Sequence, residues 1–186
     1  LCKWTKYNYW RGAIVLVKNT FLNYSKPFII AEAGINHNGS IKTALKLVDV
    51  AKSNGADAIK FQTYKTAKRV GNINKKITEI LKKCELSFSD FIKINNYCRS
   101  KKITFFSTPF DEESVDFLES INVPFYKIAS VDISNYQLIK KILKTKKPTI
   151  ASTGMASFKE IIKIDKMFRN SRNELAILHC VASYPN

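Results

Sequence analysis

The sequence predicts an α/β protein with a parallel sheet, and it favours a (β/α)8 TIM barrel that is truncated after about six β-strands. Three observations carry this prediction. Short apolar runs alternate with amphipathic helical patterns in six successive steps, which requires parallel strands joined by helices. The runs are mostly apolar on both faces, as in a buried parallel sheet. Polar residues follow the runs, at the strand ends where barrel enzymes carry their chemistry.

The predicted elements follow one another in a regular order. A strand at residues 28–33 leads to a helix that is capped by Ser40 and stopped by Asn54 and Gly55. Further strands are predicted at residues 58–63, 103–110, 124–130, 148–153 and 175–183. Further helices are predicted at residues 77–85, 88–100, 111–121, 134–145 and 157–168. Residues 64–76 form a long polar segment without a predicted element.

The rival architecture is an open, doubly wound sheet. The chain reads "AGINHNG" after its first strand, so the glycine-rich dinucleotide fingerprint of that fold is absent. A closed barrel needs eight strands, and six would leave two apolar edges. We therefore expect a partial barrel over residues 27–186, with strands seven and eight beyond Asn186. Residues 1–26 are basic and aromatic and are assigned to no part of the fold.

Composition narrows the class of protein. No run approaches 18 apolar residues, and the short apolar core at residues 13–17 is too small for a signal peptide, so we expect a cytoplasmic protein that enters no membrane. Four cysteines without a CxxC pair predict free thiols. The net charge of +16 permits a polyanion partner, but the lysines are spread along the chain, and we expect no nucleic acid.

Side-chain alternation places candidate groups on the second strand, "AIKFQT". Ile59 and Phe61 share the face suited to the helix layer, whereas Lys60 and Gln62 share the face toward the barrel mouth. A buried lysine needs an anion, and two partners fit. One is a phosphate or carboxylate of a substrate, and the other is Glu32 at the end of the first strand.

Further polar groups end the later strands. A lone hydroxyl before Pro or Gly is most often a turn residue. Here such hydroxyls share one rim with two lysines and a carboxylate, which favours a site for a phosphorylated carboxylic acid. The groups at this rim besides Glu32 and Lys60 are Ser107, Thr108, Lys127, Ser130, Asp132, Ser152 and Thr153.

The sequence offers no complete metal site. His37 and His179 are its histidines, and neither belongs to an HxH, HExxH or Cys/His cluster. His179 is expected within a strand, as a structural or substrate-contacting group. In "AEAGINHNGS", Asn36 to Gly39 are expected to shape the turn.

Several motifs together resemble one known family. They are "FIIAEAGINHNGS", "GADAIKFQTYK", "FSTPFD", "YKIAS", "PTIASTGMA" and "ILHCVASYP". From about Pro27 to Asn186 the chain resembles the sialic acid synthases, which include N-acetylneuraminate synthase and the legionaminic and pseudaminic acid synthases. The resemblance implies a barrel followed by a small antifreeze-like domain, which is absent here, and a homodimer at full length.

The resemblance also implies an activity in bacterial surface carbohydrate biosynthesis. Members of the family are transferases (EC 2.5.1) that form a C–C bond. They condense phosphoenolpyruvate with an N-acylated amino sugar, such as N-acetylmannosamine, to a nine-carbon 2-keto acid and phosphate. A divalent metal, Mn²⁺ or Mg²⁺, is implied, with its ligands beyond Asn186. The 186 residues alone are therefore expected to be inactive.

The resemblance assigns a role to each matching residue. Glu32 would orient a water or a reacting hydroxyl. The residues implied to cradle phosphoenolpyruvate are Lys60, Thr108, Lys127, Ser130 and Ser152. The residues implied to face the sugar are Gln62, Asp132 and Tyr184. Asp132 stands where some members have Glu, and Ala182 stands where some have a polar residue.

Three alternatives stay open. A Schiff-base aldolase on the same barrel would use Lys60 or Lys127 as its nucleophile. A polyanion-binding module would use the positive charge. A legionaminic, pseudaminic or spore-coat type of synthase would use the same machinery on a different sugar.

Overall fold

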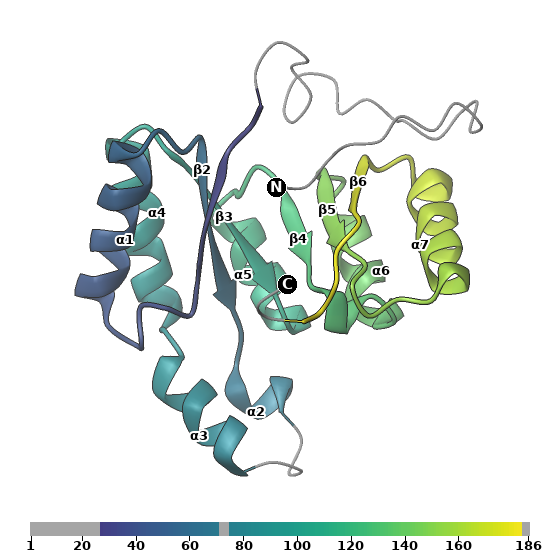
Figure 1. Ribbon diagram of the computed structural model, residues 1–186, viewed down its shortest axis with the longest axis horizontal. Helices are drawn as coiled ribbons and strands as arrows, with labels where there is room; N and C mark the ends of the chain where they lie inside the picture. Colours follow the sequence, from purple (N-terminus) through teal and green to yellow (C-terminus); the bar gives the residue numbers. More distant parts are fainter. Residues whose placement is uncertain (1–26, 71–74, 184–186) are drawn as a thin grey trace.

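The computed structural model describes residues 27–70 and 75–183. In these ranges, six parallel strands form one sheet in the order β1-β2-β3-β4-β5-β6 (Figure 1). The strands are β1 (Ile30–Gly34), β2 (Ala58–Thr63), β3 (Thr104–Pro109), β4 (Tyr126–Ile128), β5 (Thr149–Ser152) and β6 (Leu175–Leu178).

The strand order separates the two predicted architectures. Each strand pairs with its neighbours in sequence, without the reversal that defines a doubly wound sheet. The predicted barrel type is therefore confirmed as a half-barrel. Within the described residues, β1 and β6 each pair with a strand on one side.

Helices connect the strands and cover the outer face of the sheet. They are α1 (Ile41–Ser53), α2 (Thr66–Arg69), α3 (Lys75–Cys84), α4 (Phe88–Ser100), α5 (Glu112–Ser120), α6 (Tyr136–Lys144) and α7 (Phe158–Ser171), with the 3₁₀ turn η1 (Ser130–Asp132). The predicted cap of α1 is confirmed, because Ser40 Oγ accepts a hydrogen bond from the Thr43 N–H at 3.2 Å. In Figure 1, α2 and α3 project beyond the C-terminal end of β2.

Two predicted boundaries are wrong. The polar segment after β2 contains α2 and the start of α3, because the segment is anchored by a buried Tyr64 whose hydroxyl donates to Leu81 O at 2.9 Å. The last strand ends at Leu178, where its pairing with β5 ends. Leu178 O accepts hydrogen bonds from both the backbone N–H and the side-chain hydroxyl of Thr153, the residue after β5. His179 therefore lies after the strand and is exposed.

The core has two layers, as the alternation in β2 predicts. Ile59 and Phe61 pack in the large cluster between sheet and helices. A smaller cluster of Ala58, Phe106 and Phe125, together with Ile150, fills the inner, concave side of the sheet. Each fully buried aliphatic or aromatic side chain contributes about 2 kcal/mol, so the outer layer supplies most of the stability.

Two expectations from composition can be compared with the described residues. Cys84, Cys98 and Cys180 are free thiols, and Cys2 lies outside the described residues. Over residues 27–70 and 75–183, no helix has the length and apolar character needed to cross a bilayer.

Candidate active site

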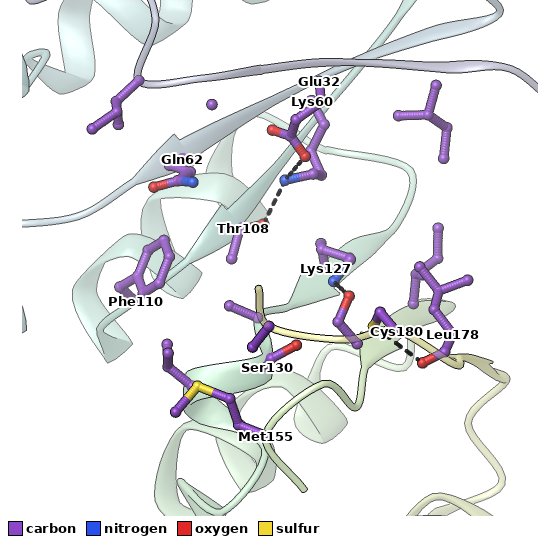
Figure 2. Close-up of a pocket in the computed structure, with 18 of the residues that line it drawn as sticks. Glu32, Lys60, Gln62, Thr108, Phe110, Lys127, Ser130, Met155, Leu178 and Cys180 are labelled. Carbon is purple, nitrogen blue, oxygen red and sulfur yellow. Dashed lines mark hydrogen bonds and ion pairs between the residues drawn. The ribbon is translucent and has the colours of Figure 1, made fainter. Parts of the chain in front are cut away.

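A cavity of about 570 Å³ opens at the C-terminal ends of the strands. Every strand of the sheet, with the loops that follow, contributes residues to its wall (Figure 2). The predicted site residues that line it are Glu32, Lys60, Gln62, Thr108, Lys127, Ser130 and Ser152. Asp132 does not line it, and Tyr184 lies outside the described residues.

The strand period explains why these groups converge. Inward-facing residues recur every second position, so an apolar floor is followed by a polar layer on the same face. The pairs from floor to polar layer are Ile30 and Glu32, Ala58 and Lys60, Phe106 and Thr108, Phe125 and Lys127, Ile150 and Ser152, and Leu178 and Cys180. The sheet thus places a layer of polar side chains above an apolar layer on its inner face.

Lys60 forms an internal ion pair and still reaches the cavity. Its Nζ lies 2.6 Å from Glu32 Oε2 and donates to Thr108 Oγ1 at 3.2 Å. The Lys60 side chain is 9% exposed, whereas that of Glu32 is 57% exposed. The lysine is therefore fixed in the wall, and the carboxylate keeps access to water or a ligand.

Lys127 has neutral neighbours instead. Its Nζ donates to Ile128 O at 2.8 Å and to Ser152 Oγ. No ion pair to Lys127 is found within the described part of the chain. Burial, together with the nearby Lys60, lowers the pKa of Lys127 to about 8. An anion in the cavity would restore a high pKa and gain a strong contact.

Ser130 and Gly154 bring two rim loops together. Ser130 Oγ accepts from the Gly154 N–H at 3.1 Å. A Cβ on Gly154 would lie 3.0 Å from Ala182 N, so the glycine permits close approach of the loop after β6. Asp132, two residues after Ser130, accepts from Asn135 Nδ2 at 3.3 Å, and burial raises the pKa of its carboxyl.

The residues after β1 form the turn that the sequence predicts. His37 is buried, and its Nδ1 accepts from the Gly39 N–H at 3.1 Å. The His37 ring packs 6.0 Å from that of Phe61, and His37 does not line the cavity. Burial lowers the pKa of His37, which favours the neutral imidazole.

The sequence interpretation missed Arg69 and Cys180, which both line the cavity. Arg69 comes from α2, in the segment without a predicted element, and its guanidinium lies 3.5 Å over the Phe110 ring. Cys180 follows Leu178 at the inward period of two, and this signal could have found it. Burial raises the pKa of Cys180, but hydrogen bonds involving Thr153, Ser152, Gly154 and Ser130 outweigh it, so the pKa lies below its ordinary value.

The described residues do not form a complete site for a divalent metal. Over residues 27–70 and 75–183, no group of three or more His, Cys, Asp or Glu side chains could hold an ion. Glu32 is the carboxylate in the cavity wall, and one carboxylate is too few for a dedicated site. The prediction of ligands beyond Asn186 therefore stays a prediction.

Comparison with known proteins gives consistent relatives. The chain is 40% identical over 176 residues to N,N'-diacetyllegionaminic acid synthase of Legionella pneumophila, covering 85% of this chain and 49% of that protein. It is 37% identical over 174 residues to pseudaminic acid synthase of Campylobacter jejuni, covering 86% of this chain and 51% of that protein. The chain spans about half the length of the curated relatives it matches.

A solved structure extends the comparison to the fold. The N-acetylneuraminic acid synthetase of Leptospira borgpetersenii, solved in complex with citrate, superposes with a TM-score of 0.83 at 39% identity. The match covers 86% of this chain and 55% of that one. The model of the NeuB family matches residues 47–186, which include most of the cavity wall. The chain belongs to the NeuB family, whose named relatives are synthases of sialic acid type.

Proposed function

We propose that this chain supplies the phosphoenolpyruvate-binding side of a sugar acid synthase. In the proposed reaction, phosphoenolpyruvate condenses with an N-acylated amino sugar and gives a nine-carbon 2-keto acid and phosphate. The observation that carries the proposal is the pair of inward lysines in one cavity, one beside a carboxylate and one beside neutral groups. The similarity to legionaminic and pseudaminic acid synthases supports the same class of product.

In this proposal the anionic groups of phosphoenolpyruvate bind to the two lysines. Lys127 and Lys60 would hold the phosphate and the carboxylate, with the hydroxyls of Ser152 and Thr108 as additional donors. Ser130, on the turn beside Lys127, would complete the cradle. Fixed charges of this kind orient the enol carbon for attack and need no reorganisation during the reaction.

The chemistry then proceeds through bonds at two carbons of phosphoenolpyruvate. C3 attacks the aldehyde carbon of the sugar and forms the new C–C bond, the π electrons of the carbonyl move onto the aldehyde oxygen, and that oxygen takes a proton from solvent. C2 is left electron-poor. Water adds to C2 and gives its proton to Glu32, which is exposed at the cavity wall. In the resulting hemiketal phosphate, the bond between C2 and the phosphate oxygen breaks with its electron pair on phosphate. The C2 hydroxyl gives its proton to the departing phosphate, and C2 becomes the ketone.

A divalent metal, Mn²⁺ or Mg²⁺, stays part of the proposal as the Lewis acid for the aldehyde. The described residues form no complete metal site, so none of them is given a role as a metal ligand in the reaction. A homodimer and a cytoplasmic location likewise belong to the proposal.

The identity of the acyl sugar is tested with a panel. Phosphate release from phosphoenolpyruvate is measured with Mn²⁺ and with acylated amino sugars of the neuraminic, legionaminic and pseudaminic series. Release that depends on one sugar supports the proposal and names the member of the family. Release without any sugar would contradict it.

A Schiff-base aldolase is the second candidate, and one observation favours it. Lys127 is buried among neutral groups with a pKa of about 8, so part of its amine is free at neutral pH. Incubation with pyruvate and borohydride, followed by peptide mapping, separates the candidates. An adduct on Lys127 that Lys127→Arg abolishes would favour the aldolase, and its absence would favour the synthase.

A further inference from the structure

Arg69 is a third cation in the cavity wall, and it lies on a firmly held segment. The Lys65 N–H donates to Asp111 Oδ2 at 2.8 Å, and the Thr66 N–H donates to Glu85 Oε2 at 2.9 Å. In Figure 1, α2 lies beyond the C-terminal end of β2. The position of Arg69 is therefore set by contacts from its helix to two other parts of the chain.

Two aromatic rings hold the guanidinium of Arg69. Its Cζ lies 3.5 Å from the centroid of the Phe110 ring and 4.7 Å from that of Tyr64. A ring covers the face of the planar guanidinium, whereas the N–H donors point outward in its plane, where an anion can bind in bidentate geometry. Gln62 Oε1 accepts from Nη1 at 3.2 Å, and the guanidinium carries further N–H groups that Gln62 does not use.

The charge of Arg69 is not paired with an acid in the described part of the chain. All 15 Asp and Glu residues lie within residues 27–70 and 75–183, and none of them forms an ion pair with Arg69 there. Asp132 lies within electrostatic reach of Arg69, but burial raises the pKa of its carboxyl and so disfavours its charged form. A partly buried cation of this kind gains from an anionic ligand.

The carboxylate in the cavity wall leaves this charge in place. Glu32 Oε2 pairs with Lys60 at 2.6 Å. A Cβ on Gly34 would lie 3.4 Å from Glu32 Oε1 and 3.6 Å from Gln62 Nε2, so the NH₂ group of the amide is on the side of Glu32. The amide oxygen of Gln62 faces Arg69 instead. The Gln62 amide thus separates Arg69 from a carboxylate that Lys60 already compensates.

Arg69 also lies apart from the two lysines that are proposed to hold phosphoenolpyruvate. Gln62 follows Lys60 by two residues on β2, so its Cα lies about 6.6 Å further along the strand toward the cavity mouth, and Arg69 contacts Gln62 there. The pKa of Lys127 responds to the charge of Lys60, whereas that of Arg69 responds to Asp132. The cavity therefore offers two separate positions for anionic groups.

A sugar can connect these two positions. A nine-carbon product leaves six carbons for the sugar once the three of phosphoenolpyruvate are subtracted. The aldehyde at one end must lie beside the enol carbon, between the lysines and the rest of the cavity. The opposite end of the sugar then extends toward the cavity mouth, where Arg69 lies in the wall.

We propose that Arg69 binds an anionic group, a phosphate monoester or a carboxylate, at the end of the sugar opposite its aldehyde. The inference rests on the proposed function and adds the chemical class of the second substrate, an anionic N-acylated amino sugar. A phosphate monoester and a carboxylate can each accept two parallel hydrogen bonds from one guanidinium, so they form separate arms of the test.

The test compares one neutral sugar with two anionic ones. The sugars are N-acetylmannosamine, its 6-phosphate and the corresponding 6-carboxylate, N-acetylmannosaminuronic acid. The protein is the chain joined to the remaining part of its Legionella relative. The readout is kcat/KM for each sugar, from phosphate release at saturating phosphoenolpyruvate with Mn²⁺. The wild type is expected to favour one of the anionic sugars over the neutral sugar by about 10- to 100-fold, as for a hydrogen bond to a charged group.

Variants at two neighbouring positions assign this preference. Arg69→Met keeps the apolar stem and removes the charge, so it should abolish the preference. Arg69→Lys keeps the charge without the planar fork and should fall between wild type and Arg69→Met. Lys68→Met is the matched control and should keep the wild-type preference, because Lys68 lies on the same helix, pairs with Glu113 at 2.6 Å and does not line the cavity. The ratio between sugars is compared because Arg69→Met also releases the Gln62 amide.

The outcomes separate this inference from the proposed function. Equal kcat/KM for neutral and anionic sugars in the wild type, or a preference that survives in Arg69→Met, would overturn the inference while phosphate release upholds the proposed function. Competition of the 6-phosphate with phosphoenolpyruvate would also overturn the inference, because the lysines would then bind the phosphate of the sugar. A folded wild type that releases no phosphate with any of the three sugars would overturn the proposed function, and the inference with it. If Arg69→Met does not fold, Arg69→Gln and Arg69→Lys carry the comparison.

Discussion

At the scale of single residues, two lysines on the same inward face of the sheet meet different surroundings. Lys60 lies beside Glu32 at 2.6 Å, whereas Lys127 has a carbonyl and a hydroxyl as partners. The period of two within "AIKFQT" was enough to predict that Lys60 and Gln62 face inward. The partner of each lysine could not be predicted, because it depends on which side chains neighbouring strands bring to the same height.

The binding of phosphoenolpyruvate is predicted to weaken as pH rises through about 8. Lys127 loses its proton there in the folded state, whereas the unfolded chain keeps it up to about pH 10.5. The ligand-free fold should therefore gain stability between these values, since the unfolded state binds more protons in this window. Phosphoenolpyruvate binds the protonated amine of Lys127, so the increase in Tm that the ligand causes should be larger at pH 7 than at pH 9.

The control for this pH dependence is Lys127→Met. It should show a small increase of Tm with phosphoenolpyruvate at both pH values. A ligand-induced shift in the wild type that is the same at pH 7 and pH 9 would contradict the role of Lys127.

Glu32 is predicted to act in catalysis more than in binding. Glu32→Gln should lower kcat by about 10²- to 10⁴-fold, the usual range for loss of a general base. The KM for phosphoenolpyruvate should stay unchanged or fall, because Lys60 is released from its ion pair. Glu113→Gln is the matched control, since it breaks an exposed ion pair with Lys68 of the same 2.6 Å length. A kcat in Glu32→Gln equal to that of the control would count against the mechanism.

At the scale of elements, strands were predicted more reliably than connections. The bounds of β2 and α4 match their predicted ranges, because apolar period and capping are local signals. The segment with α2 was missed, since its structure depends on the distant partners Asp111 and Glu85. Arg69 was missed with it, whereas Cys180 could have been found from the period of two that placed Lys60 and Gln62 on the inward face.

The turn between β1 and α1 is predicted to be the most sensitive of the connecting loops to substitution. Gly39 has φ +75°, and a Cβ there would lie 2.2 Å from Lys83 O in α3. Gly39→Ala should lower the free energy of unfolding by about 2–5 kcal/mol, from strain plus a backbone clash. Gly55→Ala is the control, because its φ is +80° with no atom within 4 Å, and strain alone costs about 1–2 kcal/mol.

Urea unfolding followed by circular dichroism measures both glycine variants. Equal losses of stability in Gly39→Ala and Gly55→Ala would show that α3 does not pack against this turn.

At the scale of the whole molecule, the half-barrel gathers the polar groups of the cavity wall at the C-terminal ends of its strands. The sequence predicted this arrangement because the alternation of strands and helices fixes where parallel strands end. The positive charge, in contrast, is not gathered at one end of the sheet. In the described residues, some of the lysines pair with acids on neighbouring helices, as in Lys101 with Asp49 and Lys141 with Asp116.

This distribution predicts weak binding to nucleic acid. Fluorescence anisotropy with duplex DNA at 150 mM salt should give a Kd weaker than about 10⁻⁵ M, within the non-specific range. Tight binding with a steep dependence on salt would instead support a polyanion-binding module.

Phosphate release from phosphoenolpyruvate tests the central claim most directly. It is measured with Mn²⁺ and the panel of acyl sugars, on the 186-residue chain and on the version joined to the remaining part of its Legionella relative. We predict release in the joined version that requires both sugar and metal, and none from the 186 residues alone. Release by the 186-residue chain would contradict the prediction of metal ligands beyond Asn186. If neither version releases phosphate although both are folded, the synthase function would be contradicted.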